Sequence, residues 1–200
     1  MIRRALAVLP LLAILTLAAD ANAQHDASGG STLATAPAEA RQFDFLIGQW
    51  SLDVRPKVSG LAARIHGAPK FTGTWKAWRA FDGWGIEDEL RILDSSGGLR
   101  SVAHALRVFD VAAGRWSLTT LDVMRARFTP SSARFEGRAM VVTATAKDQD
   151  GKDHLVRVRF HEITATGFRY EQARSYDQGK TWEDPTLRIT ARRTAAAATR

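Results

Sequence analysis

The chain has 200 residues, with 28 Lys and Arg against 21 Asp and Glu, a formal net charge of +7 at pH 7, and no cysteine. The lack of cysteine excludes a disulfide framework, a lipid-modified cysteine and a thiolate nucleophile. The basic residues form no run of five or more, which argues against nucleic-acid binding because phosphate contacts normally need clustered cations. Weak contact with anionic lipid is compatible with the charge.

Residues 1–23 have the pattern of a cleavable secretory signal peptide. Arg3 and Arg4 precede an apolar run from Ala5 to Ala19, and Ala21-Asn22-Ala23 places small residues before the expected cut. The run is shorter than the roughly 20 residues that span a bilayer, so no transmembrane anchor is expected. Twin-arginine export is disfavoured because the longer consensus around such a pair is missing. We expect a mature protein that begins at Gln24 and is periplasmic or secreted.

Residues 24–40 are mostly small and polar, which predicts a flexible leader. Residues 41–194 are the expected domain, and residues 195–200 a disordered tail. Pro37 suits the first position of a helix. Residues 38–47 are predicted to form one or two helical turns, with Phe43, Phe45 and Leu46 packed against a core.

From Gly48 onward, short runs that alternate apolar and polar residues are separated by turn residues. They predict strands over residues 47–54, 71–78, 85–93, 102–109, 115–123, 134–146, 154–163, 168–175 and 186–193. In the clearest run, Val156, Val158 and Phe160 share one face, and Arg157, Arg159 and His161 share the other. Short loops favour antiparallel hairpins that hide their edges by closing. We expect an all-β, antiparallel up-and-down β-barrel of about 8–10 strands.

Three segments resemble known motifs. Residues 43–50, Phe-Asp-Phe-Leu-Ile-Gly-Gln-Trp, resemble the first-strand signature of lipocalin-like, or calycin, barrels, in which a helical turn leads into Gly-x-Trp. Residues 175–182 resemble the S-x-D-G-G-K-T-W hairpin of the bacterial lipocalin-like family of unknown function DUF1579, with Gln178 in place of a glycine. Residues 109–116 resemble that family's Y-D-x-x-x-G-x-W hairpin, with Phe109 in place of the tyrosine. The resemblance spans residues 43–193 and implies a lipocalin-like barrel similar in fold to ligand carriers.

The resemblance also implies a structural plug at the closed end of the barrel. Gly48 would let the chain turn into the first strand, and Trp50 would fill the closed end. A basic side chain of the last strand would cover the indole. Arg188, Arg192 and Arg193 are the candidates, and Arg192 is our prediction.

Few residues suggest catalysis or cofactor binding. The histidines at positions 25, 66, 104, 154 and 161 show no His-x-His or His-x-x-x-His spacing, so neither a metal site nor another cofactor is expected. No Gly-x-Ser-x-Gly elbow or phosphate-binding glycine loop occurs. If the protein is an enzyme, Glu87, Glu89 and His104 are the acid/base candidates inside the cup. The alternative interpretation places these carboxylates on a solvated face.

Three of the six tryptophans, Trp75, Trp78 and Trp84, lie close together in the sequence. Trp75 and Trp78 are an odd number of residues apart, so one should face inward and the other outward. Aromatic side chains at a cup mouth, near Arg157 and Arg159, would suit a hydrophobic or amphipathic small molecule. Binding such a molecule is the predicted function. The alternatives are an enzyme acting within the cup and a packed-barrel envelope interaction protein; the sequence leaves the ligand and the oligomeric state open.

Overall fold

The computed structural model describes residues 35–58, 69–148, 150–183 and 185–194. The predicted signal peptide, residues 1–23, and the predicted tail, residues 195–200, lie outside the described residues. The predicted leader, residues 24–40, is described only from Thr35 onward. Ala40 is 1% exposed and packs in the core, so the last residues assigned to the leader belong to the domain instead.

The described chain consists of ten strands and four short 3-10 helices. The helices are η1 (Ala38–Arg41), η2 (Asp44–Leu46), η3 (Phe81–Gly83) and η4 (Val123–Arg125). The strands are β1 (Gly48–Pro56), β2 (Phe71–Ala80), β3 (Gly85–Leu93), β4 (Leu99–Asp110), β5 (Arg115–Asp122), β6 (Arg127–Glu136), β7 (Ala139–Lys147), β8 (Asp153–His161), β9 (Gly167–Ser175) and β10 (Leu187–Arg193). The helical turns predicted within residues 38–47 correspond to η1 and η2.

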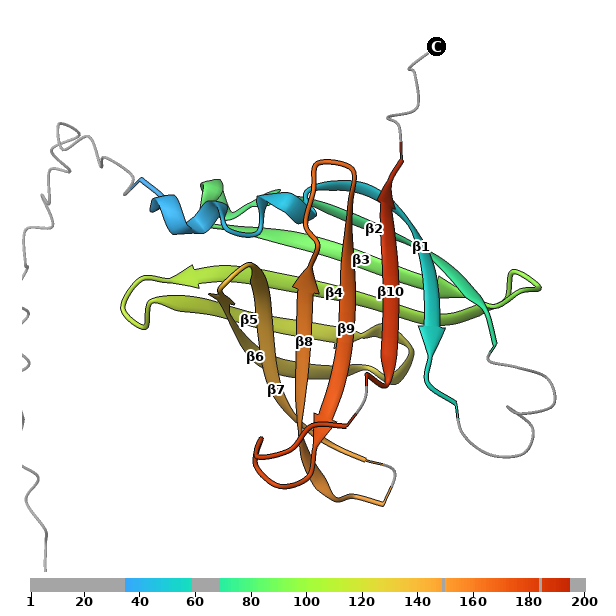
Figure 1. The fold of residues 1–200 in the computed structure, drawn as a ribbon. Helices are drawn as coiled ribbons and strands as arrows, with labels where there is room; N and C mark the ends of the chain where they lie inside the picture. The colour runs from blue at the N-terminus through green and yellow to red at the C-terminus, as the bar shows by residue number, and fades with distance from the viewer. Residues whose placement is uncertain (1–34, 59–68, 149, 184, 195–200) are drawn as a thin grey trace, which may run out of the picture. The chain divides into compact units, whose positions relative to one another are not determined.

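Each strand pairs antiparallel with its neighbours in the sequence, and β1 also pairs with β10. Figure 1 shows this order around the barrel, from β1 in cyan to β10 in red, which lies beside it. The closure leaves none of these strands with an unpaired edge. The predicted all-β, up-and-down barrel is therefore confirmed, with ten strands.

One predicted strand is wrong, because residues 134–146 form parts of two strands. β6 and β7 meet at a tight turn in which Glu136 pairs with Ala139 and Gly137 has a φ of 61°. Among the residues of β6, only Ala133 is buried. The strand therefore lacks the apolar alternation that makes other strands visible in the sequence.

The end of the barrel where β1 begins, here called the closed end, is filled by aromatic side chains. Trp50 is 1% exposed, and its Nε1 donates a hydrogen bond of 2.7 Å to the backbone oxygen of Leu46 in η2. Phe43 makes an edge contact with Trp116, at 4.9 Å between ring centroids, and Trp50 makes one with Phe168 at the same distance. Trp50 thus lies where the plug was expected.

The cation that covers this plug is Arg193, and the prediction of Arg192 is wrong. Arg193 pairs with Trp50 across the β1–β10 ladder, and its guanidinium lies 4.1 Å from the indole centroid. The same side chain donates hydrogen bonds to the backbone oxygens of Ile47 and Ala165, at 2.8 and 2.7 Å. Arg192 is exposed and, by alternation, points to the other face. Gly48, with φ 125°, leaves room for Arg193, which a Cβ at that position would meet.

Candidate functional site

The inner face of the barrel encloses a cavity of about 120 Å³ between the closed end and the opposite end, here called the mouth, where β1 ends. Its apolar lining consists of Leu90, Ala103, Ala105, Leu118, Val142, Val158 and Phe160. Its polar lining consists of Trp75, Asp88, Arg107, Thr120, Ser131 and Tyr170. The barrel is therefore not completely packed, and its free space has both apolar and polar walls.

A buried ion pair between Asp88 and Arg107 forms part of the wall of this cavity. The Nε of Arg107 donates to Oδ2 of Asp88 at 2.6 Å, and the Nε1 of Trp75 donates to Oδ1 of Asp88 at 2.7 Å. Both carboxylate oxygens are thus occupied. The guanidinium of Arg107 also lies 5.0 Å from the ring centroid of Phe43, so it contacts the aromatic side chains of the closed end.

Register explains why these charged groups meet. Asp88 shares the inward face of β3 with buried Ile86, and Arg107 shares the inward face of β4 with buried Ala105 and Phe109, because these residues are spaced by two. Ile86 faces Arg107 in the β3–β4 ladder, which places Asp88 diagonally beside it on the inner face.

The free donors of this site belong to Arg107. Arg107 bonds to Asp88 through Nε alone, and its two Nη groups have no acceptor among the residues that the structure describes. An arginine presents five N–H donors and no acceptor. A molecule in the cavity would therefore meet hydrogen-bond donors that require oxygen or another acceptor.

Tyr170 is a second polar group in the wall of the cavity. Its hydroxyl donates to Oε1 of Gln172 at 3.1 Å, which leaves the phenol oxygen able to accept a bond from a ligand or water. Burial raises the pKa of the Tyr170 hydroxyl, so it stays protonated at neutral pH. The ring contacts Trp75 and Phe160, with centroids 6.0 and 5.3 Å apart.

The interior is accessible towards the mouth. The inward-facing side chains at the closed end, such as Trp50, Trp116 and Met140, are fully buried, whereas Leu90, Thr120 and Tyr170 are partly exposed. This gradient shows that the cavity is shielded at the closed end and less shielded at the mouth.

The structure separates the residues predicted to bind a ligand. Trp75 faces inward and lines the cavity, whereas Trp78 is 42% exposed on the outer face, as their odd spacing required. Trp84 follows η3, between the end of β2 and the start of β3, which is the closed end and not the mouth.

Arg157 and Arg159 also lie outside the barrel, because they alternate with the inward-facing Val158 and Phe160. Arg157 stacks over Trp182, with its guanidinium 4.0 Å from the ring centroid. These arginines therefore cannot line the interior.

The acid/base candidates come together, but not inside the cup. Glu87 pairs with Trp78, and Glu89 with His104, on the outer face of β2, β3 and β4. His104 lies 3.5 Å from Glu87, and its ring centroid is 5.8 Å from that of Trp78. The expectation that they act within the cup is wrong, because strand alternation turns Asp88, and not its neighbours, inward.

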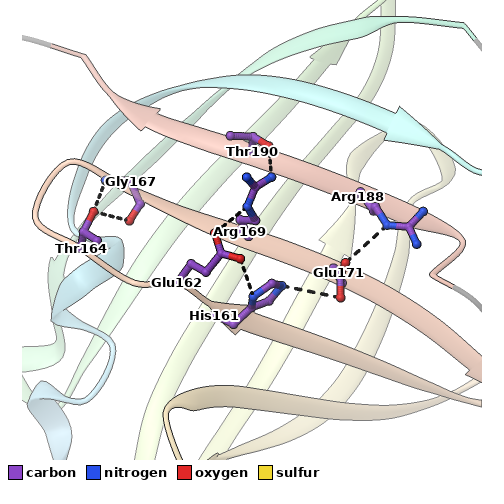
Figure 2. A network of polar contacts seen from close by, with 8 residues as sticks. All are labelled: His161, Glu162, Thr164, Gly167, Arg169, Glu171, Arg188 and Thr190. Atoms are coloured by element: carbon purple, nitrogen blue, oxygen red, sulfur yellow. Dashed lines mark hydrogen bonds and ion pairs between the residues drawn. The ribbon is translucent and has the colours of Figure 1, made fainter.

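A second polar cluster lies on the outer face of β8, β9 and β10, shown in Figure 2. Arg169 donates to Glu162 at 2.7 Å and to the hydroxyl of Thr190 at 3.2 Å. This hydrogen bond holds the pKa of the Glu162 carboxyl below its usual value. Figure 2 shows that Arg169 thereby links Glu162, in the loop between β8 and β9, to Thr190 of β10.

The same cluster continues through His161, which lies between two carboxylates, 3.7 Å from Glu162 and 3.6 Å from Glu171. Glu171 in turn lies 3.4 Å from Arg188 of β10. Exposed ion pairs of this kind contribute little stability individually. We interpret the cluster as cross-strand contacts that tie the last three strands together.

Among the described residues, no helix is long and apolar enough to cross a membrane. Within the same part of the chain, no group of three or more histidines and carboxylates is arranged to hold a metal ion. No known protein-family profile matches the chain, and no curated protein matches it.

Proposed function

We propose that the protein binds a small amphipathic molecule inside the barrel. The observation that carries this proposal is the cavity itself: apolar side chains form most of its wall, and Arg107 presents unused donors beside Asp88. Few convergent polar groups in an otherwise apolar pocket are typical of small-molecule sites. The apolar part of the ligand would lie against Leu118, Val142 and Val158, and an uncharged oxygen, from the ligand or from water, would accept from Arg107.

The cavity volume limits the size of the ligand. A cavity of about 150 Å³ holds benzene, whereas drug-sized ligands occupy about 300–1,000 Å³. At about 120 Å³, the interior holds a ring or about six carbons of a chain, and the rest of a longer chain would extend from it towards the mouth. Burying that many carbons against the cost of ordering a ligand gives an affinity on the order of 10–100 µM.

Two further observations bear on the alternatives. An enzyme within the cup would need acid or base groups facing the cavity, but both oxygens of Asp88 already accept hydrogen bonds. A completely packed barrel would leave no cavity. The proposed role also agrees with the resemblance to lipocalin-like barrels, and we propose membership of that group together with export to the periplasm or medium.

Tryptophan emission offers a direct test, because Trp75 lines the cavity and Trp78 does not. Titration of the wild type with octan-1-ol should change the emission saturably, since the alkyl chain displaces water beside the Trp75 indole. The change should persist in Trp78→Phe and be largely lost in Trp75→Phe. A wild-type signal that never saturates, or one that disappears only in Trp78→Phe, would contradict binding in this cavity.

A further inference from the structure

Four buried side-chain nitrogens of the described residues have no hydrogen-bond partner: His154 Nδ1, Arg157 Nε, His161 Nε2 and Arg174 Nε. Such orphaned atoms are rare in folded proteins, so each requires an explanation. For the two nitrogens on the outer face of the barrel, nearby contacts supply the explanation. Arg157 stacks on an indole, and His161 Nε2 faces the carboxylate of Glu171 at 3.6 Å.

The other two nitrogens, of His154 and Arg174, belong to the inner face near the mouth. Arg174 pairs with Val156 across the β8–β9 ladder, and His154 is two residues before Val156 on β8. Alternation places both on the same face as Val158, which lines the cavity. Arg174, opposite Val156, therefore lies about 7 Å along the strands from Val158, and His154, four residues before Val158, lies about 14 Å from it, nearer the mouth.

Charge distinguishes this position from the buried ion pair. Arg107 is neutralised by Asp88, whereas no carboxylate among the described residues pairs with Arg174. His154 is 6% exposed, and its ring stacks against Tyr176 at 5.2 Å. Asp148, which acts on His154 electrostatically, already accepts from the backbone N–H groups of Asp150 and Lys152. The mouth therefore combines an unbalanced cation with two unused nitrogens.

We propose that His154 and Arg174 form an anion-binding subsite that holds the carboxylate of a short apolar acid, whose hydrocarbon part extends into the cavity. Both nitrogens are buried, so the two side chains would turn as the carboxylate enters, and Arg174 Nε and His154 Nδ1 would then donate to it. This inference rests on the proposed function and adds the chemical class of the ligand. A neutral oxygen suits the compensated Arg107, whereas a formal negative charge suits the uncompensated Arg174.

Calorimetric titration with three probes tests the subsite. The purified protein should bind octanoate at least about tenfold more tightly than octan-1-ol, because only the carboxylate forms charge-assisted hydrogen bonds with the subsite. Acetate, which carries the anion without a chain, should bind far more weakly than octanoate. Arg174→Gln and His154→Gln should each reduce the octanoate preference while leaving octan-1-ol binding within about twofold. Arg174→Lys, which keeps the charge, should retain part of the preference.

Arg159→Gln is the matched control, because it removes an exposed arginine from the outer face of β8. Its octanoate affinity should equal that of the wild type, and thermal unfolding should show that every variant is folded. Equal binding of octanoate and octan-1-ol by the wild type would overturn the subsite and leave the interior site standing. Acetate binding as tight as that of octanoate would overturn the link to the cavity. Failure of both amphiphiles to bind would overturn the proposed function, and the subsite with it.

Discussion

Arg107 donates a hydrogen bond of 2.6 Å to Asp88 inside the barrel, and only 7% and 3% of the two side chains are exposed. Breaking a buried pair leaves an uncompensated charge, so Asp88→Asn should lower the free energy of unfolding by about 3–5 kcal/mol. Replacing both groups removes that penalty. The double variant Asp88→Asn/Arg107→Met should therefore be more stable in urea titration than Asp88→Asn alone. The single variant Arg107→Met completes the cycle. If the losses of unfolding free energy in the two single variants add up to the loss in the double variant, the description of a coupled pair is contradicted.

The closed-end plug gives a second prediction, because Arg192 and Arg193 are adjacent residues with different contacts. Arg193→Ala removes a cation above Trp50 and two hydrogen bonds to backbone oxygens, and should cost about 1–2 kcal/mol. Arg192→Ala, on the outer face, should stay within about 0.5 kcal/mol of the wild type. Trp50→Ala should cost about 3–5 kcal/mol. Urea titration measures all three, and an equal effect of the two arginine variants would contradict the assignment.

Acid unfolding gives the third prediction. The Thr181 side chain and backbone N–H donate to Asp177 at 2.6 and 2.9 Å, and Ser175 donates at 2.7 Å. These bonds lower the pKa of the Asp177 carboxyl from 3.8 to about 2. Because the folded value lies below the unfolded one, this stabilisation is complete above about pH 4 and is lost as the pH falls towards about 2.

Asp177→Asn removes that titration. Its unfolding free energy should therefore lie furthest below that of the wild type above about pH 4, and the two should converge as the pH falls towards about 2. Urea titrations at several pH values measure the difference. A gap that stays constant across this range would show that the hydrogen bonds do not favour the ionised carboxylate.

Much of the barrel could be predicted from strand alternation. The spacing of Val156, Val158 and Phe160 predicts which face of β8 is buried. The odd spacing of Trp75 and Trp78 predicts that one indole faces the interior of the barrel and the other the exterior. β6 was not predicted as a separate strand, because its sequence, which includes Arg127, Pro130 and two serines, shows no apolar periodicity. Local pattern alone could not separate β6 from β7.

The candidate site was less accessible to prediction, because it depends on register between strands. Asp88 and Arg107 each stand at an inward position between apolar residues, which is a signal in the sequence, but their meeting requires the β3–β4 pairing. Arg157 and Arg159 were assigned to a cup that their own alternation with Val158 excludes. Trp84 follows Asp82-Gly83, which is a turn signal in the sequence, but local sequence does not say at which end of the barrel that turn lies.

The interior cavity is the proposed binding site, and filling it tests that proposal directly. Ala105 is 3% exposed and lines the cavity, so Ala105→Leu fills free space, whereas Ser117→Leu adds the same side chain on the exposed face of β5. Calorimetric titration with octan-1-ol should give wild-type affinity, on the order of 10–100 µM, for Ser117→Leu. Ala105→Leu should bind at least about tenfold more weakly while remaining folded, because its side chain occupies the volume that the alkyl chain needs. Undiminished binding by a folded Ala105→Leu variant would contradict the interior site.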